Sequence, residues 1–293
     1  MTDNPAKETR TKKMYGKIYT SYHKQCSVLE DNFIVPVHAG RACNKPNKDD
    51  SSAKKLPSNL VHMVGDDTGD NISARNNEFN ECSVLYWIWK NEDYKNLKYV
   101  GLFQYRRHLI LNNYFNNAKN DLEKRAYKCT HFKKISTSYE DTIGLSEKNV
   151  LSILENYDCI LPYSTDFSAI NTTSSYDDWV YNIPGVHVSD LVELEKTVKE
   201  LHPEMSEALN VYLNSPSKRM YHIFIAKPTI FNEYCKWLFE ILFELDKRID
   251  TTLYSINGKR TLGYLAETLY GFYFYYMQDK IKIKECGVAF IEG

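Results

Sequence analysis

KYVGLFQYRRHL, residues Lys98–Leu109, joins a short apolar run to a group of polar and cationic side chains. The run Tyr99–Phe103 predicts a buried strand, with Gln104–His108 at its carboxyl end. Ligands of open α/β sheets bind beyond the carboxyl ends of strands. The planar fork of an arginine matches phosphate oxygens two at a time, so Arg106 and Arg107 predict a site for a phosphorylated ligand. The alternative is a strand followed by solvated arginines.

The rest of the chain alternates strand-like and helix-like segments. Strands are predicted at Lys17–Ser21, Phe33–Val37, Leu60–Val64, Tyr99–Phe103, Asp158–Leu161, Met220–Ala226 and Lys280–Ile291. Helices are predicted at Asn77–Asn91, from an N-cap at Ser146 to about Asn156, from a cap at Ser189 to about Leu201, from Pro203, at Pro228–Ile249 and at Lys259–Met277. This alternation without internal repeats predicts an α/β fold with a mainly parallel central sheet and a helix-rich C-terminal half.

Polar segments separate these elements. Loops are predicted at Gly40–Asn59, at the acidic turn-rich stretch Gly65–Ser73 and at Thr165–Pro184. Asn112–Thr142 is long and polar, which indicates an insertion or a mobile lid.

Composition excludes several classes of protein. The net charge of −1 over 293 residues argues against a general nucleic-acid binder, which would carry a basic excess. The seven cysteines are scattered, odd in number and without C-x-x-C spacing, which indicates reduced thiols in the cytoplasm. Cys129 and His131 lie close in sequence, but two ligands do not make a zinc site, and we expect no metal-binding residues.

Domain organisation follows from the same patterns. Residues 1–13 are polar and charged, without the apolar core of a signal peptide, and are expected to be a disordered tail. No run approaches the length of a membrane span, so a soluble protein, at most peripheral to a membrane, is expected. Residues 14–293 are expected to form one domain, in which 14–165 mainly bind a nucleotide and 166–293 mainly bind an acceptor.

Several motifs together resemble a bacterial family, domain of unknown function 4422, found among capsular and exopolysaccharide glycosyltransferases. The motifs are KIYTSYHK (17–24), GDDTGDNIS (65–73), NEFNECSVLYWIWKN (77–91), YVGLFQYRRHL (99–109), HIFIAKPTIFNEYCKWLFEILFELDKRI (222–249) and R-x-x-G-Y-L-A-E (260–267). They cover nearly the whole chain after residue 15. Two positions depart from the family pattern, since Gln104 replaces its usual His and His222 its usual Asn.

The resemblance implies a glycosyltransferase with a fold similar to the GT-A (Rossmann-like) nucleotide-sugar class. The implied donor is a nucleotide-sugar, a UDP-sugar by preference, with galactose or galactofuranose as plausible sugars. The residues expected to contact it are Tyr22, His23, Asp67, Asp70, Asn71, Tyr105, Arg106 and Arg107. Asp66, Asp67 and Asp70 could accept hydrogen bonds from uracil or ribose, bind a cation, or merely cap a helix.

The arginine pair occupies a special position in this comparison. GT-A enzymes carry a metal-binding Asp-x-Asp where this chain has Gln104-Tyr105-Arg106-Arg107. Charge on the leaving diphosphate must be neutralised, and either a metal or arginines can do it. We therefore expect Arg106 and Arg107 to take over part or all of the metal's task, which leaves a requirement for Mn²⁺ or Mg²⁺ open.

Inverting sugar transfer also needs a general base near the acceptor hydroxyl. The candidates are Asp178 and Glu267, then Asp177, His187 and His222. Glu267 lies amid leucines in a predicted helix, two turns after Arg260, so a structural Arg–Glu pair is the alternative for it. The tryptophans and phenylalanines at helical spacing, Trp87, Trp89, Trp237, Phe239 and Phe243, are expected in the core.

The expected acceptor is a lipid-linked glycan at the inner face of the cytoplasmic membrane. Basic residues of the polar insertion could touch anionic lipid, or simply be solvated: Lys119, Lys124, Arg125, Lys128, Lys133 and Lys134. Alternative functions are a nucleotide-sugar hydrolase, a phosphotransferase, or a non-catalytic carbohydrate-binding protein. No G-x-x-x-x-G-K-[ST] loop is present, which argues against a P-loop kinase.

Overall fold

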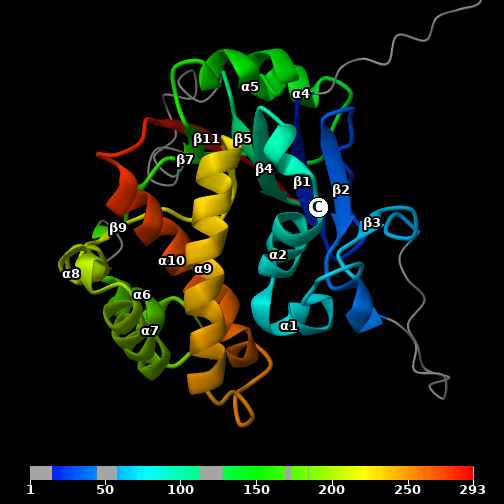
Figure 1. The fold of residues 1–293 in the computed structure, drawn as a ribbon. Coiled ribbons are helices and arrows are strands. Elements are labelled where there is room, and N and C mark those ends of the chain that lie inside the picture. The colour runs from blue at the N-terminus through cyan, green and yellow to red at the C-terminus, as the bar shows by residue number, and fades with distance from the viewer. Residues whose placement is uncertain (1–14, 45–57, 113–127, 169–172, 184, 293) are drawn as a thin grey trace, which may run out of the picture.

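The computed structural model describes residues 15–44, 58–112, 128–168, 173–183 and 185–292. The proposed tail 1–13 and the basic residues Lys119, Lys124 and Arg125 lie outside them. Helices cover both faces of a central sheet, which has nine strands in the described part of the chain (Figure 1). None of the described helices has the length and hydropathy needed to cross a membrane.

One half of the sheet is parallel. Strand β1 (Gly16–Tyr22) lies between β2 (Ile34–His38) and β4 (Tyr99–Gln104), and β3 (Val64–Gly65) extends this half beyond β2. The predicted strands Lys17–Ser21, Phe33–Val37 and Tyr99–Phe103 are confirmed as β1, β2 and β4. Most of the predicted strand Leu60–Val64 is instead a turn. Because Ser21 pairs with Gln104, the carboxyl ends of β1 and β4 meet at one edge.

The other half is mixed, which corrects the expectation of a mainly parallel sheet. Its strands are β5 (Arg107–Ile110), β6 (Cys129–Phe132), β7 (Cys159–Pro162), β10 (Phe224–Ala226) and β11 (Ile283–Ile291). Strand β10 is antiparallel to β4 and β7, and β5 is antiparallel to β4 and β11. A two-residue turn after β4 forces this reversal for β5. The pairings β4–β10–β7–β11–β5–β4 form a closed ring.

The described helices are α1 (Asn76–Phe79), α2 (Cys82–Asn91), α4 (Tyr139–Ile143), α5 (Glu147–Leu154), α6 (Ser175–Tyr181), α7 (Val188–Leu201), α8 (Ser206–Leu213), α9 (Pro228–Arg248) and α10 (Thr261–Met277). Most helices lie where the sequence predicts them, but α4 falls largely in the predicted insertion or lid Asn112–Thr142 and α6 in a predicted loop. Ser146 caps α5 as predicted, and its hydroxyl accepts a hydrogen bond from the N–H of Asn149.

Three further sequence predictions are wrong at the level of single elements. The helix predicted at Asn77–Asn91 is broken into α1 and α2 at Asn80, whose φ of 51° is left-handed. The predicted loop Thr165–Pro184 contains α6, capped by Ser174, and β8 (Thr165–Asp166), which pairs with β9 (Ser217–Lys218). Helix α7 begins at Val188, so Ser189 lies inside it rather than capping it.

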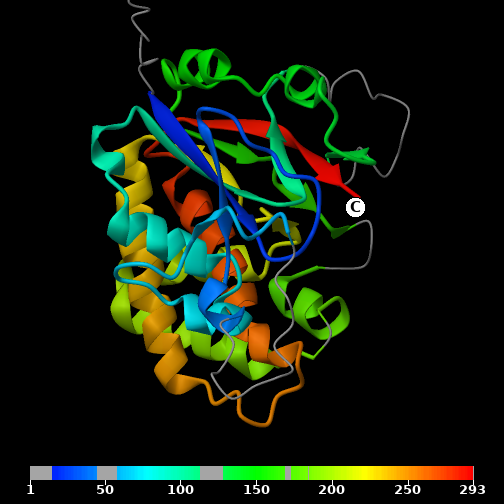
Figure 2. The same cartoon turned by 90° about the vertical axis from the view of Figure 1, so that its right-hand side faces the viewer.

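Successive side chains of a strand lie on opposite faces of the sheet and pack in two apolar layers. On one face, Ile18 of β1 packs with Tyr139 and Val150 of α4 and α5. On the other face, Tyr19 packs in a larger layer that includes α2, α7, α9 and α10 (Figure 2). Trp87 and Trp237 belong to this layer, as predicted. All seven cysteines are free thiols.

Candidate functional site

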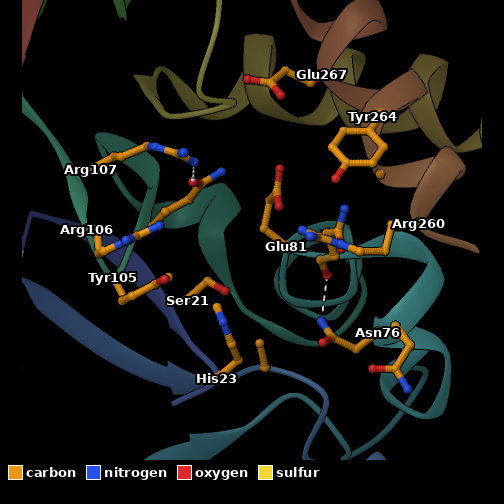
Figure 3. A pocket seen from close by; sticks show the side chains of 15 residues that line it. Ser21, His23, Asn76, Glu81, Tyr105, Arg106, Arg107, Arg260, Tyr264 and Glu267 are labelled. Carbon is orange, nitrogen blue, oxygen red and sulfur yellow. Dashed lines mark hydrogen bonds between the residues drawn. The ribbon is translucent and has the colours of Figure 1, made fainter. Parts of the chain in front are cut away.

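A polar cleft of about 470 Å³ opens at the carboxyl ends of β1 and β4. Its walls come from both halves of the chain (Figure 3). The lining residues are Ser21, His23, Ala39, Asn76, Asn77, Asn80, Glu81, Gln104, Tyr105, Arg106, Arg107, Arg260, Gly263, Tyr264 and Glu267. This volume falls in the range of about 300–1,000 Å³ that is typical of small-molecule sites.

The turn between β4 and β5 forms the cationic wall. The guanidinium of Arg106 stacks over the rings of Tyr105 and Phe290, at 5.0 and 5.2 Å from their centroids. That of Arg107 lies 5.0 Å from the ring of Tyr221. Among the described residues neither guanidinium pairs with a carboxylate, and the Nε atoms of both are buried without a hydrogen-bond partner. Two positive charges therefore face the cleft without a direct ion pair in the described residues.

Gln104, which stands where the family pattern has His, has a defined place here. Its Oε1 accepts a hydrogen bond from Nη1 of Arg107 at 2.5 Å. A neutral amide fixes the direction of the guanidinium without cancelling its charge. Gln104 is therefore a positioning residue for Arg107.

The opposite wall is built on the break between α1 and α2. Nε of Arg260 donates to Oδ1 of Asn80 at 2.9 Å, and its guanidinium lies 5.3 Å from the ring centroid of Tyr264. A Cβ at Gly263 would come within 1.8 Å of Nδ2 of Asn80, so glycine at this position of α10 leaves room for the Asn80 side chain. In the described residues Arg260 thus binds Asn80 and does not pair with Glu267, which removes the structural Arg–Glu alternative.

Two carboxylates, Glu81 and Glu267, face each other across the cleft in Figure 3. Oε1 of Glu81 lies 3.3 Å from Nδ1 of the fully buried His222, whose Nε2 lies 2.8 Å from the hydroxyl of Tyr234. Burial alone would raise the pKa of Glu81, but the hydrogen bond and charge of His222, together with Arg107, hold that pKa below its usual range. Of the two carboxyls of the cleft, Glu81 is therefore the one whose pKa is lowered.

Glu267 has the opposite electrostatics. Burial raises the pKa of its carboxyl, Arg107 opposes the rise, and the charge of Glu81 adds to it. Its Oε1 accepts a hydrogen bond from the backbone N–H of Tyr221 at 2.5 Å. A carboxyl with a raised pKa that opens into a cleft has the properties of a general base.

Backbone strain marks the segment that holds both carboxylates. Tyr221 and His222 have φ values of 80° and 42°, in the left-handed region that favours glycine. Such residues cost about 1–3 kcal/mol each and persist where the surrounding contacts determine them. The left-handed pair also explains why β10 begins at Phe224 rather than at the predicted Met220.

The structure separates the expected nucleotide contacts into two groups. His23 and Tyr105 lie in the cleft with ring centroids 4.8 Å apart, and burial with the nearby Lys24 and Arg260 lowers the pKa of His23. Tyr22 is fully buried, and its hydroxyl accepts a hydrogen bond from the N–H of Leu29.

The acidic loop lies outside the cleft lining. Asp66 is fully buried and accepts hydrogen bonds from the N–H groups of Gly40 and Arg41 and from two serine hydroxyls, so it holds the loop together. Asp67 is 3.9 Å from Arg41, Asp70 accepts from Tyr86, and Asn71 bonds within its own turn.

Of the other base candidates, His222 is fully buried against Glu81, and Asp177, Asp178 and His187 lie outside the cleft lining. Asp177 accepts hydrogen bonds from the hydroxyl and the N–H of Thr173 just before α6, which lower its pKa. Asp178 forms an ion pair with Lys218 at 3.0 Å. The ring of His187 packs on Tyr254, with centroids 4.2 Å apart. Of these three, only Asp178 lines a described cavity, and this cavity is not the polar cleft but a second one.

The donor set at the end of β4 does not fit a divalent metal. Guanidinium groups cannot ligate a cation, so Arg106 and Arg107 provide no metal ligand there. Among the described residues no group of three or more His, Cys, Asp or Glu side chains has a metal-binding arrangement. Cys129 instead donates to the hydroxyl of Tyr221.

Comparison with known proteins agrees with the family resemblance of the sequence motifs. A family described as "Domain of unknown function (DUF4422)" matches residues 17–279. A solved structure of apo WbbM, a bifunctional glycosyltransferase, is similar with a TM-score of 0.80 and 30% identity. That match covers 95% of this chain but 45% of WbbM, so the chain spans less than half of that protein. No curated protein matches. Because the family match extends over most of its length, the chain belongs to the DUF4422 family.

Proposed function

We propose that this chain is a glycosyltransferase that binds a nucleoside-diphosphate sugar in the polar cleft. The observation that carries the proposal is the pair Arg106 and Arg107, two guanidinium groups without a carboxylate partner in the described residues at the carboxyl end of β4. Arg260 adds a third on the opposite wall. The similarity to a glycosyltransferase of known structure supports the same activity.

The arginines act on the leaving group. As the bond between the anomeric carbon and the phosphate oxygen breaks, negative charge grows on the departing nucleoside diphosphate. Arg106 and Arg107 stabilise that charge, since charge-assisted and bidentate bonds to phosphate are the strong ones. His23 directly follows β1, and Tyr105 lies in the same turn as Arg106. In this proposal their rings contact the nucleoside.

Glu267 is the general base in this proposal. An acceptor hydroxyl attacks the anomeric carbon, a new carbon–oxygen bond forms, and Glu267 takes the hydroxyl proton. Its raised pKa makes it a stronger proton acceptor than an ordinary carboxylate. Glu81, held ionised by His222, keeps a negative charge nearby that supports this shift.

The finer assignments extend this proposal from the family resemblance. We propose a UDP-sugar, with galactose or galactofuranose as the transferred unit, and a lipid-linked glycan of a bacterial surface polysaccharide as acceptor. Such an acceptor would bring the protein to the cytoplasmic face of the membrane. Lys128 is one of the basic residues proposed to touch lipid. In the structure its Nζ donates a hydrogen bond to the carbonyl of Ser164 and lies over the ring of Tyr163.

Thermal-shift measurements with UDP, GDP, CMP and their sugars, each with and without Mn²⁺, test the proposal. A ligand that binds the folded state raises the melting temperature. We expect a shift with a nucleoside diphosphate that persists in excess chelator. The absence of a shift with every nucleotide would contradict a transferase, and sugar release that ignores any acceptor would indicate a hydrolase. Loss of sugar transfer in chelator, restored by Mn²⁺, would refute the role of the arginines as replacements for a metal.

A further inference from the structure

A second cavity, of about 380 Å³, lies beside the cleft. Tyr264 and Glu267 line both cavities, so these two side chains of α10 form a shared wall. The other lining residues are Phe167, Ser175, Asp178, Trp179, Asn182, Ile183, Tyr212, Lys218, Arg219, Met220 and Thr268. All of them fall within the second half of the chain.

The lining combines aromatic faces with fixed polar groups. Phe167, Trp179 and Tyr212 supply rings, and Lys218 and Arg219 are both about 8% exposed. A sugar ring presents apolar C–H faces and a rim of hydroxyls, so it needs both kinds of contact. Buried ion pairs rarely add stability, because desolvation offsets their attraction. Charged groups kept in this wall therefore indicate a polar ligand.

The charges of this cavity are balanced, unlike those of the cleft. Nζ of Lys218 lies 3.0 Å from Oδ2 of Asp178. Nη2 of Arg219 lies 2.8 Å from Oε1 of Glu285, and its Nη1 donates to the carbonyl of Pro162. Each cation already has its anion, so a phosphate or carboxylate ligand would find no spare positive charge. The chemistry fits an uncharged polyol.

The shared wall gives this ligand a place in the reaction. Glu267 faces the phosphate-binding cleft on one side and the neutral cavity on the other. A hydroxyl that reaches Glu267 from the second cavity meets the group that takes its proton. We propose that this cavity binds an uncharged hexose unit of the acceptor glycan, an assignment that rests on the proposed function.

Saturation-transfer NMR on the full chain tests this assignment. The probes are methyl β-D-galactopyranoside, methyl α-D-glucopyranoside and methyl α-D-mannopyranoside, with methyl β-D-glucuronide as a charged comparison. Thr268→Phe places a ring in the cavity, and Thr268→Leu is a milder variant if the first fails to fold. Val211→Phe, at a position of α8 that is 52% exposed, is the matched control.

We expect at least one neutral hexoside to bind the wild type and Val211→Phe, and to bind either Thr268 variant at least tenfold more weakly. The thermal shift with UDP should persist in the Thr268 variants, which shows that the cleft is intact. Absence of binding by every neutral hexoside, equal binding by the Thr268 variants, or a preference for the glucuronide would overturn the proposal. A wild type that binds a hexoside but no nucleotide would instead contradict the proposed function, and with it the acceptor role.

Discussion

The carboxylate of Glu267 in α10 accepts a hydrogen bond from the backbone N–H of Tyr221, 2.5 Å away and 46 residues earlier in the chain. The same tyrosine ring lies under the guanidinium of Arg107. Tyr221, whose backbone is strained, thus contacts both the proposed base, Glu267, and the proposed phosphate-binding residue, Arg107. Tyr221 therefore links Glu267 of α10 to Arg107 of the turn between β4 and β5.

Glu267→Gln is expected to abolish the base while it preserves the hydrogen bond from Tyr221. We expect kcat for sugar transfer to fall by about 10²–10⁴, the range for loss of a general base, with UDP affinity unchanged. Since burial raises the pKa of Glu267, its ionisation at neutral pH disfavours the folded state, and the neutral glutamine should raise the melting temperature. Full activity in this variant would exclude Glu267 as the base.

Glu81→Gln tests the electrostatic coupling between the two carboxylates. The charge of Glu81 contributes to the raised pKa of Glu267, so its removal should lower that pKa. The base must be deprotonated to act, and the acidic limb of the kcat/KM profile should therefore move to lower pH. The profile of Glu244→Gln, a change at a surface carboxylate of α9, serves as the reference. An unmoved limb would contradict the coupling.

Arg106→Ala removes a guanidinium from the cationic wall. Hydrogen bonds to charged groups contribute about 1.5–3 kcal/mol, so UDP should bind roughly 10- to 100-fold more weakly in titration calorimetry. Arg106→Lys should recover part of this loss, because the charge returns without the planar fork. Arg248→Ala, at the end of α9, is the matched control and should leave affinity unchanged. Equal affinity in all three variants would refute a phosphate role for Arg106.

His222 allows the strained turn to be tested separately from the chemistry. His222→Ala should lower the free energy of unfolding by about 2 kcal/mol or more, since it leaves Glu81 and Tyr234 without their buried partner. Asn tolerates left-handed backbone better than Ala, so His222→Asn should be the more stable of the two variants by about 1 kcal/mol in urea unfolding. The reverse order would show that the backbone conformation contributes little.

The fold could be predicted from the sequence where a local pattern decides the structure. The apolar run of β4 and the amphipathic period of α9 are recognisable without knowledge of their neighbours. Strand direction is different, because three residues of β10 carry no signal for which partner they meet. The break at Asn80 lies beside a distant part of the chain, since the Asn80 side chain packs on Gly263 of α10.

The site was predictable in the same uneven way. Arg106, Arg107 and Glu267 stood out as charges beside apolar runs, and the structure brings them to one cleft. The sequence predicts Arg260 only as a possible pairing partner of Glu267, and it does not single out Glu81 as a site residue. Their role in the cleft depends on Asn80, which turns the chain between α1 and α2 and binds Arg260. The asparagines Asn76 and Asn80 are the feature of the sequence that could have indicated this helix break.

Strand β4 ends at the arginine turn and is hydrogen-bonded on both sides, to β1 and to β10, inside the closed ring of strands. Its amides should accordingly be among the last in the chain to exchange with deuterated solvent. The orientation of Arg106 and Arg107 is set during folding, so a ligand would meet preorganised charges and need not order them. Adaptation to donors of different shape would then fall to the side of the cleft formed by α10.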